Sequence, residues 1–318
     1  MKYEVVALGE LLIDFTDHGV SDRGNPVFEA NPGGAPGNVL AMLAKLGHKT
    51  AMIGKVGDDI FGAILIETLE KIGIGTANVY KTEQAGTTLA FVHNTPGGDR
   101  EFSFFRKPGA DTLLRYDEVG ADSIKNCRIF HFGSLSLTAE PARKATQTAV
   151  IAAKANRTVI SFDPNLRPML WKDSSDAKLQ IEWGCSMCHI LKIADDELLF
   201  LTGRDDGAGI DILRAKFPEI KLIFLTKGVH GAEGYWGNLH SSRPAFLQID
   251  AIDTTGAGDT FFGCCLSRVL ACDIDRPDQA VLDDMLVFAC AAAALTTTKK
   301  GALLSMPDRD EISALINQ

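Results

Sequence analysis

The sequence predicts an α/β protein in which helices cover both faces of a mainly parallel central sheet. Short apolar runs alternate with segments whose apolar residues recur at helical spacing, a pattern typical of βαβ units. The chain has 318 residues, 46% of them hydrophobic, and contains no low-complexity tract. Such a chain can bury one large core or two modest ones. We expect a single domain over residues 1–318.

Six short apolar runs are the predicted strands, and four of the segments between them are predicted helices. Ligands of such sheets bind at the carboxyl ends of the strands, so residues that follow a strand are the first candidates for a site. The strands are expected at Val5 to Leu8, Ala51 to Val56, Ile129 to Phe132, Thr158 to Phe162, Ile190 to Ile193 and Leu222 to Leu225, and the helices at Val39 to Leu46, Phe61 to Ile72, Pro141 to Ala155 and Ile210 to Phe217.

Two segments break this alternation, at about 15–32 and 86–106. The first is polar and turn-rich around Val27 and Phe28. The second has period-2 apolar patterning on both sides of a glycine turn, which predicts a β-hairpin. From the residues alone, this hairpin is as consistent with an ordinary surface hairpin as with a functional element. Its expected parts are the strands Thr87 to His93 and Glu101 to Phe105 and the turn Pro96-Gly97-Gly98-Asp99.

Composition argues against nucleic acid and membranes as partners. The formal net charge is −9, and no basic cluster exceeds the pair Lys299-Lys300. The N-terminal segment lacks the pattern of a signal peptide, and no apolar run reaches membrane-spanning length. We therefore expect a cytoplasmic protein.

The seven cysteines are expected to be reduced thiols in the core. One pair, Cys185 and Cys188, has the Cys-x-x-Cys spacing, but no second pair or His-x-x-x-His completes a zinc site. The seven histidines show no metal-ligand spacing either. A structural role is therefore expected for the cysteine pair.

The strongest candidate for chemistry is Asp253 to Asp259, directly before an apolar, helix-like run. Gly256 and Gly258 flank Ala257, which predicts a tight turn that opens a buried helix. The free N–H groups of such a turn and the positive end of the helix dipole favour an anion. Asp259 beside this point is placed to take a proton from a hydroxyl that attacks phosphorus.

A helix cap is the alternative role for Asp259. The stretch differs from both common phosphate loops, since it lacks Gly-Lys-Ser/Thr, and Phe261 stands where G-x-G-x-x-G has its third glycine. At these residues the chain resembles the ribokinase-like (PfkB) family of sugar kinases, whose C-terminal motif has this form. The resemblance implies an ATP-dependent kinase with Asp259 as the base and Gly256, Ala257 and Gly258 around the transferred phosphoryl group. It also implies that the two interrupting segments form a small β-sheet lid, which in many members is a homodimer contact.

The N-terminal part holds the predicted sugar contacts. Asp14 ends an apolar run, where its carboxylate needs donors such as sugar hydroxyls. The turn from Asn31 to Asn38 contains glycines that let backbone approach a small ligand, although a flexible turn with a capping Asn is the better explanation when this stretch is considered alone. With Asp259, these stretches resemble the family's N-terminal motif. The resemblance implies sugar contact for Asp14, Gly33, Gly34 and Asn38.

Two further stretches narrow the resemblance to the fructokinase branch. They are Phe104 to Asp111 and Asp163 to Trp171, and each places an arginine just after a strand, where its fork suits substrate oxygens or phosphate. An ion pair between Arg167 and Asp163 is an equally open interpretation. The resulting substrate-binding candidates are Arg106, Asp163, Asn165 and Arg167.

The nucleotide site is expected in the C-terminal half, at about 190–318. The strand that ends in a glycine turn at Thr226, Lys227, Gly228 and Gly231 resembles the family's ATP-phosphate strand. A small-residue helix with Ala289, Ala292 and Ala293 would let a flat base pack closely, and close core packing explains it as well. Lys192 is expected to add positive charge near the phosphates.

Two cation sites are implied by the resemblance. Many relatives carry Asn-x-x-Glu to organise water around Mg²⁺, whereas this chain has Ala194 in place of the Asn and keeps Glu197. Mg²⁺ retains waters and phosphate oxygens, so this change affects the geometry of the site more than its use of metal. A monovalent cation, K⁺ by resemblance, would be held mainly by backbone oxygens of Asp253, Thr255, Thr296, Lys299, Gly301 and Ser305.

The sequence thus predicts a kinase that phosphorylates a hexose at a primary hydroxyl, fructose at its 6-hydroxyl. A 2-keto-3-deoxygluconate kinase, or another sugar kinase of the family, is the first alternative; an acidic substrate would need a cation such as Arg106 or Arg167. A catalytically silent relative that binds sugar or nucleotide is the second alternative.

Overall fold

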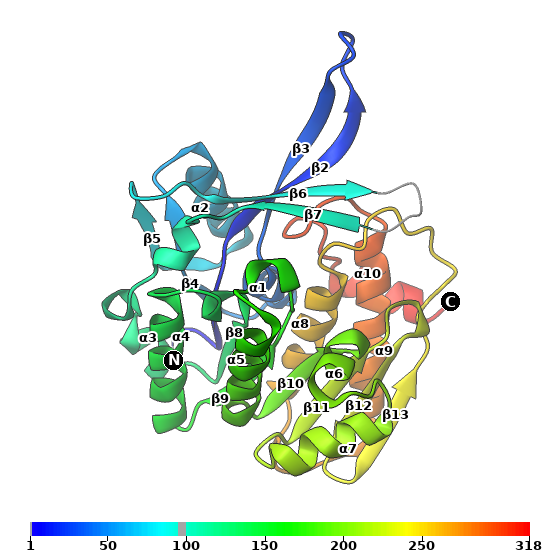
Figure 1. Cartoon of the computed structure of the whole chain (residues 1–318). Coiled ribbons are helices and arrows are strands. Elements are labelled where there is room, and N and C mark those ends of the chain that lie inside the picture. The colour runs from blue at the N-terminus through cyan, green and yellow to red at the C-terminus, as the bar shows by residue number, and fades with distance from the viewer. Residues whose placement is uncertain (1, 95–99) are drawn as a thin grey trace.

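The computed structural model describes residues 2–94 and 100–318. In this part of the chain a nine-stranded sheet is flanked by helices, and a separate four-stranded sheet lies at one end of it (Figure 1). The strands are β1 (Val5–Leu8), β2 (Leu12–Val20), β3 (Pro26–Gly33), β4 (Thr50–Gly57), β5 (Gly75–Thr82), β6 (Thr88–Asn94), β7 (Arg100–Phe105), β8 (Ile129–Gly133), β9 (Val159–Asp163), β10 (Ile190–Ala194), β11 (Leu222–Thr226), β12 (Ala232–Trp236) and β13 (Leu239–Arg243). The α-helices are α1 (Ala35–Lys45), α2 (Ile60–Ile72), α3 (Ala121–Lys125), α4 (Ala142–Ala155), α5 (Ser174–Met187), α6 (Asp195–Thr202), α7 (Gly207–Lys216), α8 (Ala257–Val269), α9 (Gln279–Thr297) and α10 (Arg309–Ile316).

The large sheet has the order β13-β12-β11-β10-β9-β8-β1-β4-β5. The seven strands from β5 to β11 in this order are parallel, whereas β12 and β13 are antiparallel. From β1 the chain first adds β4 and β5 on one side and later β8 to β11 on the other. The strand order therefore reverses at β1 and β8, and an α/β sheet binds ligands at the carboxyl ends of the strands at such a point.

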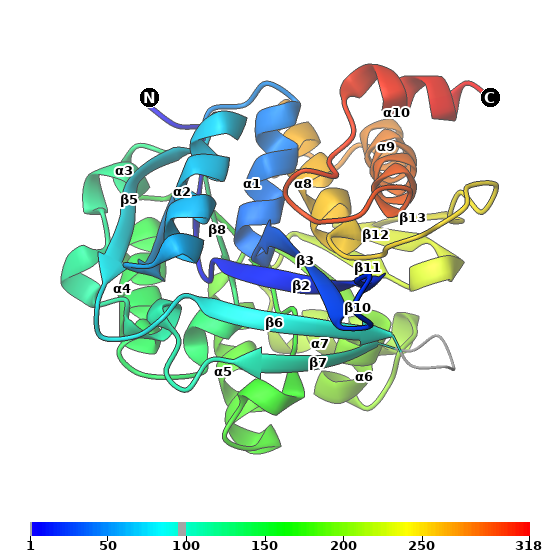
Figure 2. The ribbon, with the colours of Figure 1, turned by 90° about the horizontal axis from the view of Figure 1, so that it is seen from above.

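Helices cover both faces of the large sheet, and each face has its own apolar core. Helices α1, α2, α8, α9 and α10 lie on one side, and α4 to α7 lie on the other (Figure 2). Fully buried Leu40, Phe262 and Leu286 belong to the first core, and Phe132, Phe162 and Ile181 to the second. The α/β architecture predicted from the sequence is confirmed.

The small sheet has the order β3-β2-β6-β7 and contains both segments that break the alternation. Strand β2 pairs with β3 antiparallel and with β6 parallel, and β6 pairs with β7 antiparallel. The polar segment at 15–32 is thus mostly strand. The predicted turn Pro96-Gly97-Gly98-Asp99 lies outside the described residues, and strands β6 and β7 lie on either side of it.

The structure adds elements that the sequence analysis did not predict. Strands β12 and β13 form a hairpin around the two-residue connection Gly237-Asn238. A Gly-Asn pair between two strands is a known hairpin signal, and the residues of β12 alternate between buried and part-exposed. Strand β5 is a part-exposed edge strand, so it lacks a continuous apolar run. Helix α1 begins at Ala35, four residues before the predicted start, because Gly34 (φ 119°) and Pro36 set its first turn.

Among the described residues, one helix, α9, is long and apolar enough to cross a membrane. Half of this stretch is buried, and α9 packs against α8, α10 and β13. Buried core helices have the same composition, so we assign α9 to the core of the domain.

Candidate active site

The turn at the start of α8 has the geometry that the sequence predicts. Gly256 has a φ of 79°, in the left-handed region that favours glycine, and α8 begins at Ala257. The first N–H groups of a helix have no intrahelical partner, so those of Gly258 and Asp259 face outward from the turn. Asp259 itself lies in this first turn, at the wall of a cavity.

Asn38 contacts Asp259 directly. Its Nδ2 donates a hydrogen bond to Oδ2 of Asp259 at 2.7 Å, which joins the N-terminal and C-terminal motifs. This contact depends on close packing of α1 on α8 at Gly263, where a Cβ atom would lie 2.8 Å from Cβ of Met42. Burial raises the pKa of Asp259 above its ordinary value, although the Asn38 amide and the charges of Lys192 and Arg167 oppose the shift.

A buried ion pair lies beside the turn. Nζ of Lys192, in the middle of β10, is 3.2 Å from Asp163 at the end of β9. A Cβ atom on Gly258 would be 3.4 Å from this nitrogen, so the ammonium group lies against the start of α8. Burial alone would lower the pKa of Lys192, but the carboxylates of Asp163, Glu197 and Asp259 raise it, and the side chain stays charged.

Glu197 connects two loops through backbone hydrogen bonds. Its Oε1 accepts the N–H of Leu166 at 2.7 Å, and its Oε2 accepts the N–H of Ala194 at 2.8 Å. The carboxylate is buried, which raises its pKa. Glu197 thus holds the loop after β9, which carries Arg167, against the end of β10. The sequence predicts for Glu197 only a relation to a metal ion and does not reveal these two contacts.

Most of the predicted substrate-binding residues line one cavity of about 620 Å³, which we call the polar cavity. Asn165 lines this cavity and has a φ of 44°. A positive φ is rare for a residue other than glycine and is typical of functional loops. The predicted residues in its wall are Asp14, Gly34, Asn38, Asn165, Arg167, Lys192, Glu197, Thr255, Gly256, Gly258 and Asp259, and the structure adds Glu10, Leu12, Ala35, Phe104, Leu135, Leu166, Pro168, Met169, Ala194, Asp196 and Thr254.

Three predicted sugar contacts do not line the polar cavity. Arg106 is buried and donates to Asp111, Thr138 and the carbonyl of Leu135, so its fork is already occupied. Asp163 faces Lys192. A Cβ atom on Gly33 would lie 2.6 Å from Oδ2 of Asp14, so Gly33 makes room for that carboxylate. Arg106 and Asp163 thus form buried ion pairs with Asp111 and Lys192, and their contact with a sugar stays a prediction.

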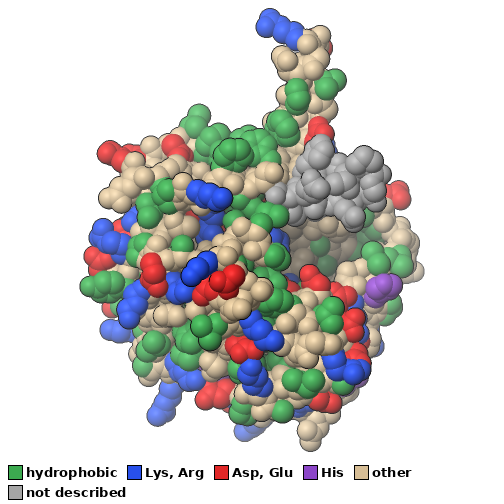
Figure 3. Space-filling model, in the orientation of Figure 1, with side chains coloured by type: hydrophobic (Ala, Val, Ile, Leu, Met, Phe, Trp, Pro, Cys, Tyr) green, Lys and Arg blue, Asp and Glu red, His purple; other side chains and the backbone are tan. Residues whose placement is uncertain are grey.

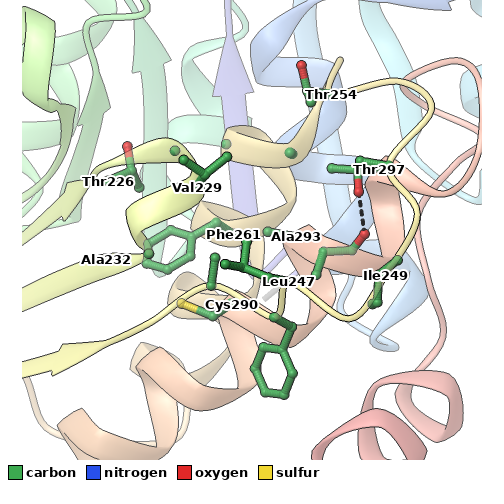
Figure 4. Close-up of a pocket in the computed structure, with 18 of the residues that line it drawn as sticks. Thr226, Val229, Ala232, Leu247, Ile249, Thr254, Phe261, Cys290, Ala293 and Thr297 are labelled. Carbon is green, nitrogen blue, oxygen red and sulfur yellow. Dashed lines mark hydrogen bonds between the residues drawn. The ribbon is translucent and has the colours of Figure 1, made fainter.

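A second cavity of about 530 Å³, the apolar cavity, lies between β11 and α9 (Figure 4). One face of α9 contributes Cys290, Ala293, Ala294 and Thr297, at helical spacing. The loop from Ala245 to Ala251 closes another side and was not predicted, because an irregular loop has no periodic signal. Further wall residues are Asp195, Thr226, Gly228, Val229, Gly231, Ala232, Ala257, Phe261 and, shared with the polar cavity, Ala194, Thr254 and Gly258.

Four of the predicted nucleotide contacts do not line the apolar cavity. Ala289 and Ala292 are fully buried in the core on another face of α9, and Cys290 and Ala294 take their place in the wall. Lys227 forms an ion pair with Glu233. Lys192 lines the polar cavity rather than this one.

The predicted monovalent-cation loop adjoins the turn before α8. Asp253 accepts the N–H of Thr255 at 2.9 Å and that of Gly301 at 3.3 Å, so its carboxylate joins the two segments. Thr296 and Ser305 are buried, and their hydroxyls bond to Thr260 and to the carbonyl of Ala302. Nζ of Lys299 pairs with Glu311 at the surface, which leaves only its backbone for a cation.

Comparisons with known proteins point to one family. The family model described as "pfkB family carbohydrate kinase" matches residues 2–309. A curated relative, fructokinase-1 of Zea mays, is 41% identical over 316 residues, which are 99% of this chain and 98% of the relative. The structure of a fructokinase with bound ATP from Xylella fastidiosa has a TM-score of 0.89 and 30% identity, with 100% of this chain and 99% of that chain covered. A fructokinase variant from Vibrio cholerae O395, bound to fructose, ADP and a potassium ion, has a TM-score of 0.88 and 29% identity, with 99% of both chains covered.

Proposed function

Because the chain belongs to the pfkB family of carbohydrate kinases, we propose that it transfers the γ-phosphate of ATP to the 6-hydroxyl of fructose. The observation that carries this proposal is that the polar and apolar cavities meet. Ala194, Thr254 and Gly258 line both of them, and Asp259 lies at this junction in the polar cavity. A sugar in the polar cavity and a nucleotide in the apolar cavity would thus bring hydroxyl and phosphate together beside a carboxylate.

Asp259 acts as the general base in this proposal. Asn38 holds its carboxylate at 2.7 Å, and the raised pKa brings the group closer to the pH at which it accepts a proton and later releases it. The N–H groups at the start of α8 stabilise the charge of the transferred phosphoryl group, and the ammonium of Lys192 lies beside them.

ATP is the phosphoryl donor, together with a divalent metal ion that we propose to be Mg²⁺. The described residues contain no group of three His, Cys, Asp or Glu side chains that holds a metal by itself. This fits Mg²⁺, which keeps waters and phosphate oxygens as ligands and needs few from the protein. When bound, the ion would neutralise phosphate charge, and the carboxylates of Asp196 and Glu197 in the cavity wall would accept hydrogen bonds from its waters. We also propose K⁺ at the loop from Thr296 to Ser305.

The polar cavity offers fewer cationic side chains than expected for the acidic alternative substrate, 2-keto-3-deoxygluconate. Arg106, one of the two arginines that a 2-keto-3-deoxygluconate kinase would use, is occupied by Asp111. Arg167 is the arginine that remains in the cavity wall among the described residues. Fructose has no carboxylate and needs no dedicated cation.

The test is ATP turnover with fructose, ribose, tagatose, adenosine and 2-keto-3-deoxygluconate. We expect fructose to give the highest kcat/KM. A higher value with 2-keto-3-deoxygluconate would reassign the substrate, and no turnover with any of these substrates would favour the silent relative. The matched control is the variant Asp259→Asn, which keeps the fold and lacks the base.

We further propose that two copies associate through the small sheet. Strands β2 and β3 project from the body of the molecule, and hydrophobic side chains lie along the projection (Figures 1 and 3). Val20, Phe28 and Phe105 on this sheet are 73%, 42% and 65% exposed, and Phe28 and Phe105 pack against Phe91. Exposed apolar patches of this kind mark protein contacts. Light scattering that reports a monomer of 34.3 kDa at working concentration would refute the dimer.

We propose a cytoplasmic location. All seven cysteines are free thiols, and six of them are buried. Reduced cysteines are typical of a reducing compartment, which also supplies ATP. Cell fractionation of the tagged protein tests this assignment, and recovery in a membrane or secreted fraction would contradict it.

A further inference from the structure

Glu10 is a buried carboxylate in the wall of the polar cavity, and the proposed mechanism gives it no role. It follows β1 at the point where the strand order reverses, opposite Leu135, which follows β8. Its side chain is only 2% exposed. A buried acidic group is costly unless it has partners, so the partners of Glu10 indicate what it does.

The first partner is the N-terminus of α1. Oε1 of Glu10 accepts the N–H of Ala35 at 3.0 Å, and α1 has no acidic residue in its own first turn. Glu10 therefore supplies the negative charge that stabilises this end of the helix. The backbones also touch, since a Cβ atom on Gly34 would lie 2.4 Å from the carbonyl oxygen of Glu10.

The second partner is the charge of Arg106, at the base of the small sheet. Arg106 follows β7 and is fixed by Asp111, which also accepts a hydrogen bond from Thr88 at the start of β6. Burial raises the pKa of Glu10 to about 7; the positive charge of Arg106 opposes this shift, and the negative charge of Asp111 adds to it. Glu10 thus lies between the start of α1 and the base of the small sheet.

One oxygen of Glu10 is left over. Among the described residues, Oε2 is buried and has no hydrogen-bond partner. A buried oxygen without a partner destabilises the fold, and an apolar residue in place of Glu10 would avoid this cost. The presence of an acid at the cavity wall therefore points to a requirement of the site.

We propose that Glu10 is a positioning residue for sugar binding. Its carboxylate fixes Gly34 and Ala35, the backbone that lines the polar cavity, relative to the base of the small sheet at Arg106. It acts through these groups on sugar affinity and not on phosphoryl transfer. This inference rests on the proposed function, because it takes the ligand of the polar cavity to be a sugar.

The test is the variant Glu10→Gln, which keeps the size of the side chain and an acceptor for the Ala35 N–H but removes the charge. We expect the Kd of fructose, measured by calorimetry without ATP, to rise about tenfold, the loss typical of one charged hydrogen bond, while kcat and the KM of ATP stay at parent values. The protonated form cannot hold the helix end as an anion does. In the parent, fructose affinity should therefore fall as the pH drops through about 7, and this dependence should be absent in the variant.

The matched control is Glu118→Gln. Glu118 accepts the N–H of Arg115 at 2.8 Å and pairs with buried Lys55 at 2.7 Å, but it lines neither cavity. It should lose stability without losing fructose affinity. Parent-like fructose binding in Glu10→Gln, or equal losses of fructose and ATP affinity in both variants, would overturn the proposal. A parent that binds fructose without turnover would refute the kinase function and leave this comparison intact.

Discussion

The polar and apolar cavities share a wall but are built from opposite kinds of side chain. The polar cavity gathers Asp14, Asn38, Arg167, Lys192 and Asp259 from five separate stretches of the chain. The apolar cavity is formed by small and apolar residues of β11, α8, α9 and one loop (Figure 4). The first site recognises its ligand by directional hydrogen bonds, and the second by shape and apolar contact. Their junction at Gly258 is where chemistry takes place in the proposed function.

The largest expected effect is at this junction. Asp259→Asn keeps the size of the side chain and one oxygen, but the amide cannot accept the proton of the attacking hydroxyl. General-base catalysis typically contributes about 10²- to 10⁴-fold, so kcat should fall by that amount. The Kd values of ATP and fructose should change little, since both cavities remain intact. A kcat within a few-fold of the parent would show that another group is the base.

A pair of substitutions tests the contrast between the cavities. Asp14→Ala in the polar cavity should weaken fructose binding by about 1–3 kcal/mol, as expected for a lost charged hydrogen bond, without a change in the KM of ATP. Ala293→Leu on α9 should fill part of the apolar cavity and raise the KM of ATP about tenfold, at the scale of a steric misfit of one side chain, without a change in fructose affinity.

Each variant of this pair is the control for the other. If both lose affinity for both ligands, the defect lies in folding, and thermal unfolding should show it. If Asp14→Ala mainly affects ATP, the assignment of ligands to cavities is reversed.

The same contrast explains what the sequence predicts and what it does not. The sequence predicts Asp259, Gly256 and Asn38 because a polar residue or a glycine beside a buried apolar run destabilises the fold unless it has a structural or functional role. The apolar wall gives no such signal, since Ala292 and Ala294 are identical in type and differ only in which face of α9 they occupy. The central strands are predictable because they are buried on both sides, whereas the edge strands β5 and β13, and β12 next to β13, are part-exposed and have mixed patterns.

Supporting residues form a third category. The sequence places Arg106 just after a strand, as it does Arg167, and only the fold shows that Asp111 occupies the first of them. Glu197 likewise has the position of a metal-site residue, but its two oxygens accept backbone N–H groups from two loops. Such roles depend on contacts between distant segments, which spacing along the chain does not reveal.

The smallest expected effect concerns the loop from Thr296 to Ser305. Of its residues, Thr297 lines the apolar cavity, and none lines the polar cavity. The carboxylate of Asp253 already joins this loop to the turn before α8, through Thr255 and Gly301. A cation bound to backbone oxygens there would make that junction stiffer and fix the N–H groups at the start of α8. Preorganisation of this kind acts on the rate more than on affinity.

K⁺ should therefore raise kcat by a few-fold, about 1 kcal/mol in the barrier, at saturating fructose and Mg-ATP, and Na⁺ should raise it less. Equal rates in K⁺, Na⁺ and a bulky organic cation at matched ionic strength would exclude a functional monovalent site, and the hydrogen bonds of Asp253 would then suffice to hold the turn.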